Sequence, residues 1–230
     1  MEYKNLFFDL DRTLWDFETN AQEALSELYE EHQLAAKGIS SVSNFIKNYK
    51  LHNERLWELY RKGQVEKEVL RSSRFLLTLN DFQIDDSALA SALGDQYIQI
   101  CPMKTHLFPF THETLDYLYK KYRLHIITNG FEEVQYIKLE QSKMLHYFEQ
   151  VITSEQVGVK KPHPDVFKHA MLKAFCKPEE SVMIGDDLPV DILGAKAVGM
   201  HQVYFNPKRM AHSESITHEI SCLSQLQELF

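Results

Sequence analysis

The sequence predicts an α/β fold: a Rossmann-like parallel sheet covered by helices, with an all-helical module inserted after the first strand. Two observations support this prediction. Apolar segments too short for helices alternate with helical segments over most of the chain, which is typical of parallel βαβ units. Several of these segments end in carboxylates or a hydroxyl, and α/β proteins place their functional groups at the carboxyl ends of strands.

The first predicted strand lies in the segment from Leu6 to Leu14 and delivers Asp9 and Asp11 to its carboxyl end. Two adjacent carboxylates repel each other and lose hydration unless a cation or a reacting group lies between them. A lone pair of acids can also bond backbone amides and cap the next element. The pair therefore indicates a functional site only in combination with later segments.

After Leu14 the alternation stops, and residues 15–101 read as consecutive helices separated by polar breaks. Their apolar residues recur with helical spacing, in the stripes Leu56, Leu59, Tyr60; Leu70, Leu77; and Leu89, Leu93, Tyr97, Ile100, the last behind the N-cap candidates Asp85 and Asp86. We expect a core domain of residues 1–14 and 102–230 and a helical cap domain of residues 15–101. An insertion directly after the first catalytic strand is expected to act as a lid.

From Leu107 onward the alternation of strand and helix resumes. The expected elements are a helix near 111–122, a strand at 124–127, a helix near 131–142, a strand at 151–153, a helix beginning beside Pro164, a strand ending at Gly185, a helix stopped by Gly199, and a strand at 202–205. This order requires a parallel sheet with helices on both faces.

Three of these later segments supply polar groups at strand ends or in a loop. The run 124–130 ends in Thr128, Asn129 and a glycine turn, and the run 181–187 ends in Asp186 and Asp187, with Asp191 following. Lys161 precedes a proline, which biases its backbone towards an extended conformation. In order, the chain therefore offers two acids, a hydroxyl, an amine and two or three further acids.

This ordered set resembles the haloacid dehalogenase-like phosphohydrolase superfamily. The matching motifs are DxDxT at 9–13, hhT at 126–128, KP at 161–162 and GDDxxxD at 185–191. Within the superfamily, the segments DLDRTLWDF, TNGF, KLEQS and YFEQVITSEQVGVKKPHPDVF resemble the house-cleaning pyrimidine 5'-nucleotidase group. Arg12 departs from the pattern, because that position is often glycine in the superfamily, and it could alter the turn into the cap.

The resemblance implies an α/β core with a helical cap inserted between the first and second motifs. It also implies a Mg2+-dependent phosphomonoesterase that hydrolyses a small phosphorylated metabolite, with nucleoside 5'-monophosphates, especially pyrimidine ones, as the preferred candidates. Asp9 would be the nucleophile and form an aspartyl-phosphate, and Asp11 would protonate the leaving alcohol and then activate water. The expected phosphate-binding residues are Leu10, Asp11, Thr128, Asn129 and Lys161, and the expected metal ligands are Asp9, the main-chain carbonyl of Asp11, and Asp186.

Two further groups of residues carry less specific expectations. One of Asp187 and Asp191 should support the metal or hold Lys161, and the other should cap the helix near Leu188; the resemblance favours Asp191 as the functional one. Trp15, Phe17 and Asn20 lie where the chain enters the cap. They could contact the leaving group or serve as hinge packing.

Composition excludes some partners. The formal charge of −8 over 230 residues argues against a nucleic-acid polymer as partner, because no basic face is evident. The three cysteines are widely spaced and lack metal-ligand patterns, which favours free thiols in a reducing compartment. Asp9 comes too early for a secretory signal, and no apolar stretch could span a membrane. We therefore expect a cytoplasmic enzyme without a membrane partner; its oligomeric state is left open.

Three alternatives share these residues. A phosphomutase would use the same phospho-aspartate but pass the phosphoryl group to a sugar hydroxyl. A 2-haloacid dehalogenase has the same fold, but that branch differs at the second acid of the first motif and needs no metal, so Asp11 and Asp186 argue against it. A catalytically silent ligand-binding module is the third, and turnover of an aryl phosphate with Mg2+ would exclude it.

Overall fold

The computed structural model describes residues 3–230 and divides into two compact units. The α/β unit contains the chain up to Phe17 together with Thr105–Phe230, and the helical unit contains Glu18–Lys104. The boundaries predicted from the sequence lie a few residues earlier at both junctions. Among residues 3–230, no helix combines the length and apolar character needed to cross a bilayer.

The α/β unit is built on a six-stranded sheet in the order β3-β2-β1-β4-β5-β6, in which every pair of neighbours is parallel. The strands are β1 (Asn5–Phe8), β2 (Arg123–Thr128), β3 (Phe148–Thr153), β4 (Ser181–Gly185), β5 (His201–Phe205) and β6 (His218–Ile220). The predicted α/β class is confirmed. Strand β6 was not predicted, since three residues of mixed polarity carry no periodic signal.

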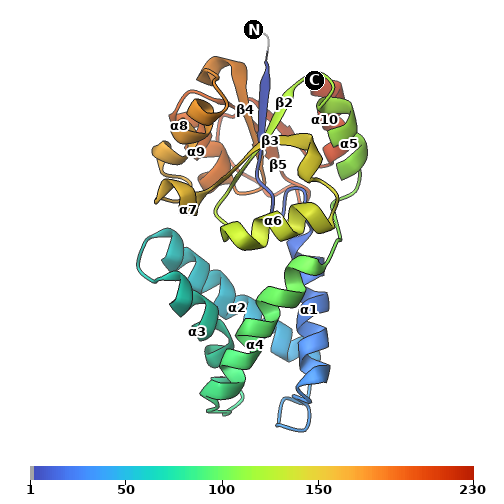
Figure 1. Ribbon diagram of the computed structural model, residues 1–230, viewed down its shortest axis with the longest axis vertical. Coiled ribbons are helices and arrows are strands. Elements are labelled where there is room, and N and C mark those ends of the chain that lie inside the picture. Colours follow the sequence, from blue (N-terminus) through green and yellow to red (C-terminus); the bar gives the residue numbers. More distant parts are fainter. Residues whose placement is uncertain (1–2) are drawn as a thin grey trace. The chain divides into compact units, whose positions relative to one another are not determined.

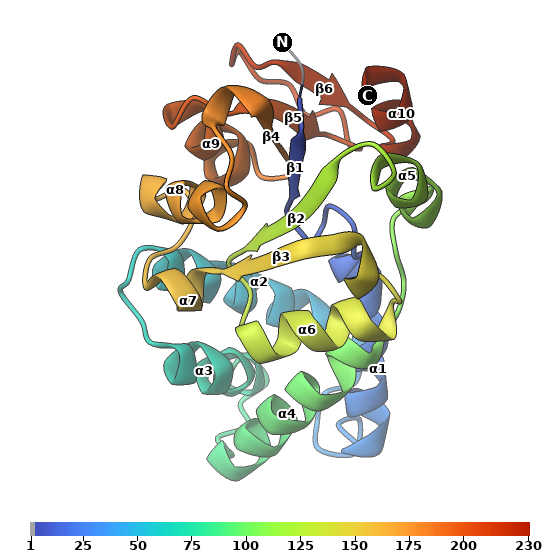
Figure 2. The same cartoon turned by 45° about the horizontal axis from the view of Figure 1, so that its top comes forward.

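Helices cover both faces of this sheet. They are α5 (Thr111–Leu118), α6 (Glu132–Gln141), α7 (Ser154–Val157), α8 (Pro164–Lys173), α9 (Leu193–Ala197) and α10 (Leu226–Leu229). Helices α8 and α9 lie on one face, and α5 and α10 lie on the other (Figure 1, Figure 2). This is the doubly wound arrangement that right-handed βαβ crossovers produce.

The core beneath α8 follows from strand periodicity. Phe7, Ile127 and Met183, from the three central strands, pack in one cluster with Val166 and Phe167 of α8. Their chain neighbours in β1, β2 and β4 face the opposite layer, because side chains alternate along a strand. Strands buried on both faces read as continuous apolar runs, which explains why these segments were recognisable in the sequence.

The strand order creates a crevice at one end of the sheet. From β1 the chain moves outward through β2 to β3, and then crosses over to β4 on the other side of β1. Between β1 and β4 the connections diverge, and such switch points leave an opening at the carboxyl ends of the strands. Asp9 and Asp186 are the residues that directly follow these two strands.

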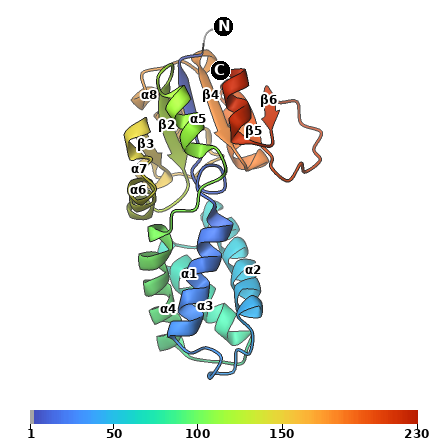
Figure 3. The ribbon, with the colours of Figure 1, turned by 90° about the vertical axis from the view of Figure 1, so that its right-hand side faces the viewer.

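The helical unit consists of four helices, α1 (Phe17–Glu31), α2 (Val42–Arg61), α3 (Lys67–Asn80) and α4 (Ser87–Ile100) (Figure 3). Of the two predicted N-cap candidates, Asp86 caps α4 by accepting a hydrogen bond from the Leu89 amide. The guanidinium of Arg74 is buried and lies 4.7 Å from the ring of Tyr97. Most residues of the predicted helical stripes are buried packing residues of this unit, whereas three are partly exposed: Leu59, Leu77 and Ile100.

Candidate active site

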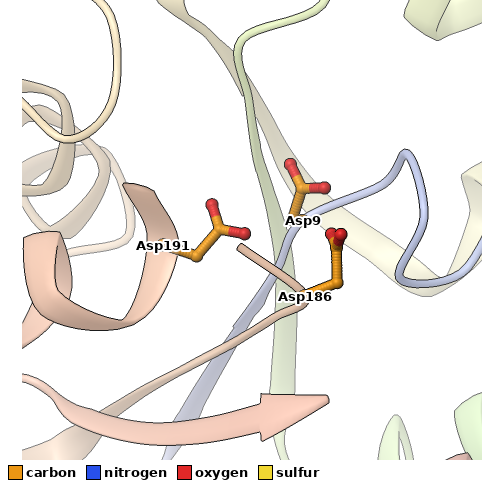
Figure 4. Close-up of side chains that lie close together, drawn as sticks. All are labelled: Asp9, Asp186 and Asp191. Carbon is orange, nitrogen blue, oxygen red and sulfur yellow. The ribbon is translucent and has the colours of Figure 1, made fainter. Parts of the chain in front are cut away.

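Three carboxylates converge at the crevice between β1 and β4. One oxygen from each of Asp9, Asp186 and Asp191 lies within 4.8 Å of the others, and Figure 4 shows the three side chains gathered around one volume. The backbone of Asp9 is fixed by an N–H···O bond of 2.9 Å to Ile184, which extends the pairing of β1 with β4. Both strands thus deliver an acid to the same point.

Asp191 reaches this point because Gly185 has no side chain. A Cβ atom on Gly185 would lie 2.4 Å from Oδ2 of Asp191, much closer than real contacts allow. Asp191 itself lies on a single π-helical turn, Leu188–Ile192, that follows β4. Sequence reasoning expected an ordinary helix here, and a π turn is frequently found at functional sites.

Lys161 joins the acids. Its buried ammonium donates hydrogen bonds to Oδ1 of Asp9 at 2.7 Å, to Oδ1 of Asp191 at 2.6 Å and to the carbonyl of Ile127 at 2.8 Å. These bonds use all three of its protons. Asn129 clamps the backbone of Lys161, accepting from its N–H at 2.8 Å and donating to its carbonyl at 3.0 Å. The Asn129 side chain is therefore used to position the lysine.

Burial and mutual repulsion dominate the electrostatics of this cluster. Burial raises the pKa of Asp9 well above its usual range, the ammonium of Lys161 opposes this, and Asp191 and Asp186 reinforce it. Burial and the neighbouring Asp191 raise the pKa of Asp186 to about 7. Burial lowers the pKa of Lys161, but Asp191 and Asp9 outweigh this, and the net shift is upward. Negative charge is in excess within the cluster.

Asp187 and Asp191 have different contacts. Asp191 accepts from Lys161 through Oδ1 and from the Asp187 amide through Oδ2, at 3.2 Å. The Asp187 side chain accepts from the Val190 amide at 3.0 Å and caps the π-helical turn. Asp191 therefore holds Lys161 in position, and Asp187 fixes the backbone turn that carries Asp191.

The carboxylate of Asp11 is held from α6. Lys138 donates to Oδ1 at 2.5 Å and Gln135 donates to Oδ2 at 3.2 Å, and both side chains are buried. Gln135 also accepts a bond of 3.3 Å from the hydroxyl of Thr128. Sequence reasoning assigned no role to Gln135 or to Lys138, although Lys138 begins the KLEQS segment; their spacing of three on a helix after the second motif was the available signal.

In the turn after Asp11, position 12 has a backbone conformation that favours glycine, although the residue is arginine. Arg12 has φ of 67°, a left-handed conformation that glycine adopts without strain, and its guanidinium lies 4.6 Å from the ring of Phe17. Thr13 donates a bond of 3.1 Å to Oδ1 of Asp186 and so ties this turn to β4. The turn closes on itself, because the carbonyl of Leu10 accepts from the amides of Leu14 and Trp15.

The three residues at the entry to the cap, for which leaving-group contact and hinge packing were both open, lie in different surroundings. The ring of Trp15 is buried and lies 4.2 Å from the ammonium of Lys138. Phe17 is half-buried at the start of α1, while Asn20 is buried further along the same helix, in the helical unit.

The donor set of the acidic cluster suits a hard divalent cation. All its ligand atoms are carboxylate oxygens, which Mg2+ prefers, and its negative charge exceeds the single ammonium of Lys161. Because both oxygens of Asp191 are already engaged, Asp9 and Asp186 are the side chains best placed to hold the cation.

Comparison with known sequences identifies the family. Residues 6–205 match the profile of the haloacid dehalogenase-like hydrolases. The chain belongs to this family. It is 30% identical to the pyrimidine 5'-nucleotidase PynA of Streptococcus pneumoniae, over 91% of this chain and 86% of the relative. It is 33% identical to a glyceraldehyde 3-phosphate phosphatase of Methanothermobacter thermautotrophicus, over 88% of this chain and 85% of that one.

Among solved structures, the fold matches the HAD-hydrolase YfnB from Bacillus subtilis with a TM-score of 0.90 and 25% identity, covering 100% of this chain and 99% of that chain. That structure is described as bound to magnesium and as revealing interdomain movement. The resemblance inferred from the four motifs is confirmed, and the relatives include nucleotidases and sugar-phosphate phosphatases.

Proposed function

We propose that this protein is a Mg2+-dependent phosphomonoesterase that forms a phosphoryl-enzyme intermediate on Asp9. The observation that supports this most directly is the environment of Asp9. It lies at the end of β1 with one oxygen bonded to Lys161, beside Asp186, and two residues before an acid that α6 holds in place. A nucleophile, a cation site and a proton donor are thus assembled at one strand end.

In the proposed reaction, Oδ2 of Asp9 attacks the phosphorus, and the bond from phosphorus to the leaving oxygen breaks. Asp11 gives its proton to that oxygen, and the alcohol departs. Asp11 then removes a proton from a water molecule, whose oxygen attacks the phosphorus of the aspartyl-phosphate. The phosphorus–Oδ2 bond breaks, inorganic phosphate leaves, and both carboxyl groups return to their starting state.

Lys161, Asn129 and Thr128 surround the position of the phosphoryl group. Lys161 supplies positive charge, and the main-chain amide of Asn129 can donate to a phosphoryl oxygen. The Thr128 hydroxyl is directed at Gln135, so it would have to turn towards the ligand to donate. Mg2+ held by Asp9, Asp186 and the carbonyl of Asp11 would offset the negative charge shared by the carboxylate and the phosphoryl group.

We assign nucleoside 5'-monophosphates as the preferred substrate class. This rests on the similarity to the pyrimidine 5'-nucleotidase PynA and on the segments that resemble that group. A sugar phosphate is the competing class, because a glyceraldehyde 3-phosphate phosphatase is similarly related. We assign the helical unit as a lid that closes for chemistry, in keeping with the interdomain movement described for YfnB.

The test is a phosphate-release screen of purified protein against nucleoside 5'-monophosphates, sugar phosphates and an aryl phosphate, with Mg2+ or with excess chelator. We expect turnover only with the metal. Asp9→Asn should retain the fold and lose activity by at least about a thousandfold, since it removes the attacking group. Asp165→Asn, at an exposed carboxylate on α8, is the matched control.

Mass spectrometry of the Asp9→Asn protein should accompany the assay, because deamidation would restore the aspartate. More than a few per cent of wild-type activity in the intact variant would contradict the assignment of Asp9. Release of halide from a 2-haloacid without metal would instead indicate the dehalogenase alternative.

A further inference from the structure

We propose that Lys138 is a positioning residue that orients the Asp11 carboxyl group for proton transfer to the leaving oxygen. This inference rests on the proposed function, in which Asp11 is the proton donor. Lys138 lies outside all four motifs and belongs to α6, which follows the second motif. Its proposed role is to act on the reaction through Asp11, and it has no assigned contact with the substrate.

The first observation is that the two oxygens of Asp11 are held separately. Lys138 donates to Oδ1 at 2.5 Å and Gln135 donates to Oδ2 at 3.2 Å. The two donors are three residues apart and lie on one face of α6. Two donors on two oxygens fix the rotation of the carboxyl group as well as its position.

The second observation is where the ammonium lies. The side chain of Lys138 is 5% exposed, whereas lysines are almost always at the surface, and a buried ammonium loses hydration that its partners must replace. Asp11 supplies one partner, and the face of the Trp15 ring, 4.2 Å from the ammonium, supplies a second through a cation–π interaction. Burial of the Lys138 ammonium therefore costs hydration free energy, and its contacts with Asp11 and the Trp15 ring offset part of that cost.

The third observation connects this lysine to the rest of the site. The Trp15 carbonyl accepts a bond of 2.9 Å from the Arg12 amide, so the ring belongs to the same turn that carries Asp11. Gln135 also accepts a hydrogen bond from the hydroxyl of Thr128. A Cβ atom on Gly130 would lie 2.1 Å from Nε2 of Gln135, so this arrangement depends on a glycine at position 130. Helix α6 therefore joins the proton donor to the phosphate-binding strand end.

The chemical consequence depends on the leaving group. A nitrophenolate leaves readily without a proton, whereas an alkoxide requires protonation as the bond to phosphorus breaks. Misorienting Asp11 should therefore slow the cleavage of alkyl phosphates much more than the cleavage of aryl phosphates. Loss of a residue that only supports the fold would slow both equally.

The experiment compares wild type, Lys138→Met and Lys138→Arg on p-nitrophenyl phosphate and on the alkyl ester glycerol 1-phosphate, at saturating Mg2+. We expect Lys138→Met to lower kcat/KM on the alkyl ester about 10- to 100-fold more than on the aryl ester, a part of the 10²–10⁴-fold that general acid catalysis supplies. This ratio reports the steps up to departure of the leaving group, so it excludes the hydrolysis of the aspartyl-phosphate, in which Asp11 serves both esters alike. Lys138→Arg should recover most of the loss, because it retains the charge and the donors. Lys168→Met, at a side chain 64% exposed on α8, should change neither rate.

Equal losses of kcat/KM on the two esters, or no loss, would overturn the inference. If Lys138→Met does not fold, Lys138→Gln takes its place in the same comparison with the same two outcomes. Wild-type protein that releases phosphate from neither ester would overturn the proposed function, whereas active wild type with equal losses in the variant would overturn only the role of Lys138.

Discussion

The missing side chain of Gly185 determines whether Asp191 can reach Lys161. The last residue of β4 lies against the carboxyl group that orients the lysine, with 2.4 Å between a hypothetical Cβ and Oδ2 of Asp191. Gly185 is therefore required so that Asp191 can approach the backbone closely. The backbone conformation does not itself require glycine here, because the φ of Gly185 is not positive. Lys161 in turn depends on Asp191 for one of its three bonds.

Gly185→Ala is expected to displace Asp191 and to lower kcat by about 10- to 100-fold, because Lys161 loses a partner that keeps it aimed at Asp9. Overpacking should also lower the free energy of unfolding by about 1–3 kcal/mol. Steady-state kinetics and urea unfolding measure the two effects. Gly63→Ala is the control: it carries the strain of φ +68° in the helical unit without a clash, so it should lose stability and keep its kcat.

A Gly185→Ala protein with wild-type kcat would show that Lys161 does not need Asp191 to remain in place. The role of Asp191 would then be restricted to stability, through its bonds to the lysine and to the Asp187 amide.

At the scale of elements, β2 shows how a polar residue can be tolerated inside an apolar strand. His125 is completely buried, its ring stacks on Phe7 with 4.7 Å between centroids, and Nε2 lies 3.2 Å from Oδ1 of Asn5. Burial, together with the nearby charge of Arg123, lowers the pKa of His125 to about 4. The imidazole is therefore neutral in the folded protein at neutral pH.

This shift predicts a pH-dependent stability. The folded-state pKa lies below the unfolded value of about 6.5, so the stabilisation is present above pH 6.5 and is lost as the pH falls towards 4, because the unfolded chain binds the proton first. Relative to His125→Gln, which does not titrate, wild type should lose about 2 kcal/mol of unfolding free energy between pH 7.5 and pH 5. Urea unfolding at both pH values measures the difference, with the exposed His163→Gln as control.

If wild type and His125→Gln lost stability in parallel over this range, His125 would not be the titrating group. The acid sensitivity of the fold would then have to be assigned to carboxylates such as those of the ion pairs on the surface.

At the scale of the whole molecule, we expect the acidic cluster to lower the stability of the fold when no cation is bound. In the absence of metal, burial and Asp191 raise the pKa of Asp186 in the folded protein to about 7, from an unfolded-state pKa of 3.8. Ionisation of Asp186 therefore lowers the stability of the folded state as the pH rises above 3.8. Functional sites commonly carry such a cost. A bound divalent cation would reverse the sign of this effect.

Asp186→Asn is therefore expected to be more stable than wild type in chelator at pH 8, by about 1–3 kcal/mol. Mg2+ should stabilise wild type, by about 2.7 kcal/mol when its concentration is a hundred times Kd, and should stabilise the variant much less. Thermal unfolding with Mg2+ and with chelator tests both statements. In activity assays, Asp186→Ala should raise the Mg2+ concentration required or remove the response.

Full activity of wild type in excess chelator, together with a Tm that Mg2+ does not change, would contradict the cation site. It would favour metal-free chemistry at Asp9, as in the dehalogenase alternative.

The two-unit organisation predicts a separation between chemistry and selectivity. Phe17 lies at the start of α1 with its ring beneath the Arg12 guanidinium, where the chain leaves the α/β unit. Phe17→Ala should change relative kcat/KM among phosphate esters by about 10- to 200-fold, corresponding to the 1–3 kcal/mol that an apolar contact discriminates, and should leave turnover of a minimal aryl phosphate largely intact. A substrate panel measures this.

Trp15→Ala is the variant to compare with Phe17→Ala in that substrate panel. Its ring contacts Lys138, so Trp15→Ala is expected to lower turnover of every alkyl ester without changing their ranking. If Phe17→Ala gave the same uniform loss, Phe17 would be hinge packing, and other residues would set the selectivity.

Much of this organisation could be read from the sequence because the signals are local. Apolar runs such as the one that precedes Asp9 identify buried parallel strands, and the order of acids, hydroxyl and lysine identifies the family without knowledge of any distance. Helix start signals were equally direct: Asp86 caps α4 and Pro164 begins α8 as expected. These features depend on a few consecutive residues and on periodicity, which the chain itself contains.

Tertiary structure alone decided which of these residues meet. The strand order brings Asp9 and Asp186 together although 177 positions separate them in the sequence, and Lys161 reaches both Asp9 and Asp191 only because β1, β2 and β4 are neighbours. Lys138 lies outside the four motifs, and the sequence assigns it no role; only the fold shows that α6 places its ammonium against both Asp11 and Trp15. The sequence by itself determined the family and predicted the reacting groups, because these depend on residue identity and order. The division of work between Asp187 and Asp191, and the support of Asp11, depend on distances between segments that only the folded chain brings within a few ångströms.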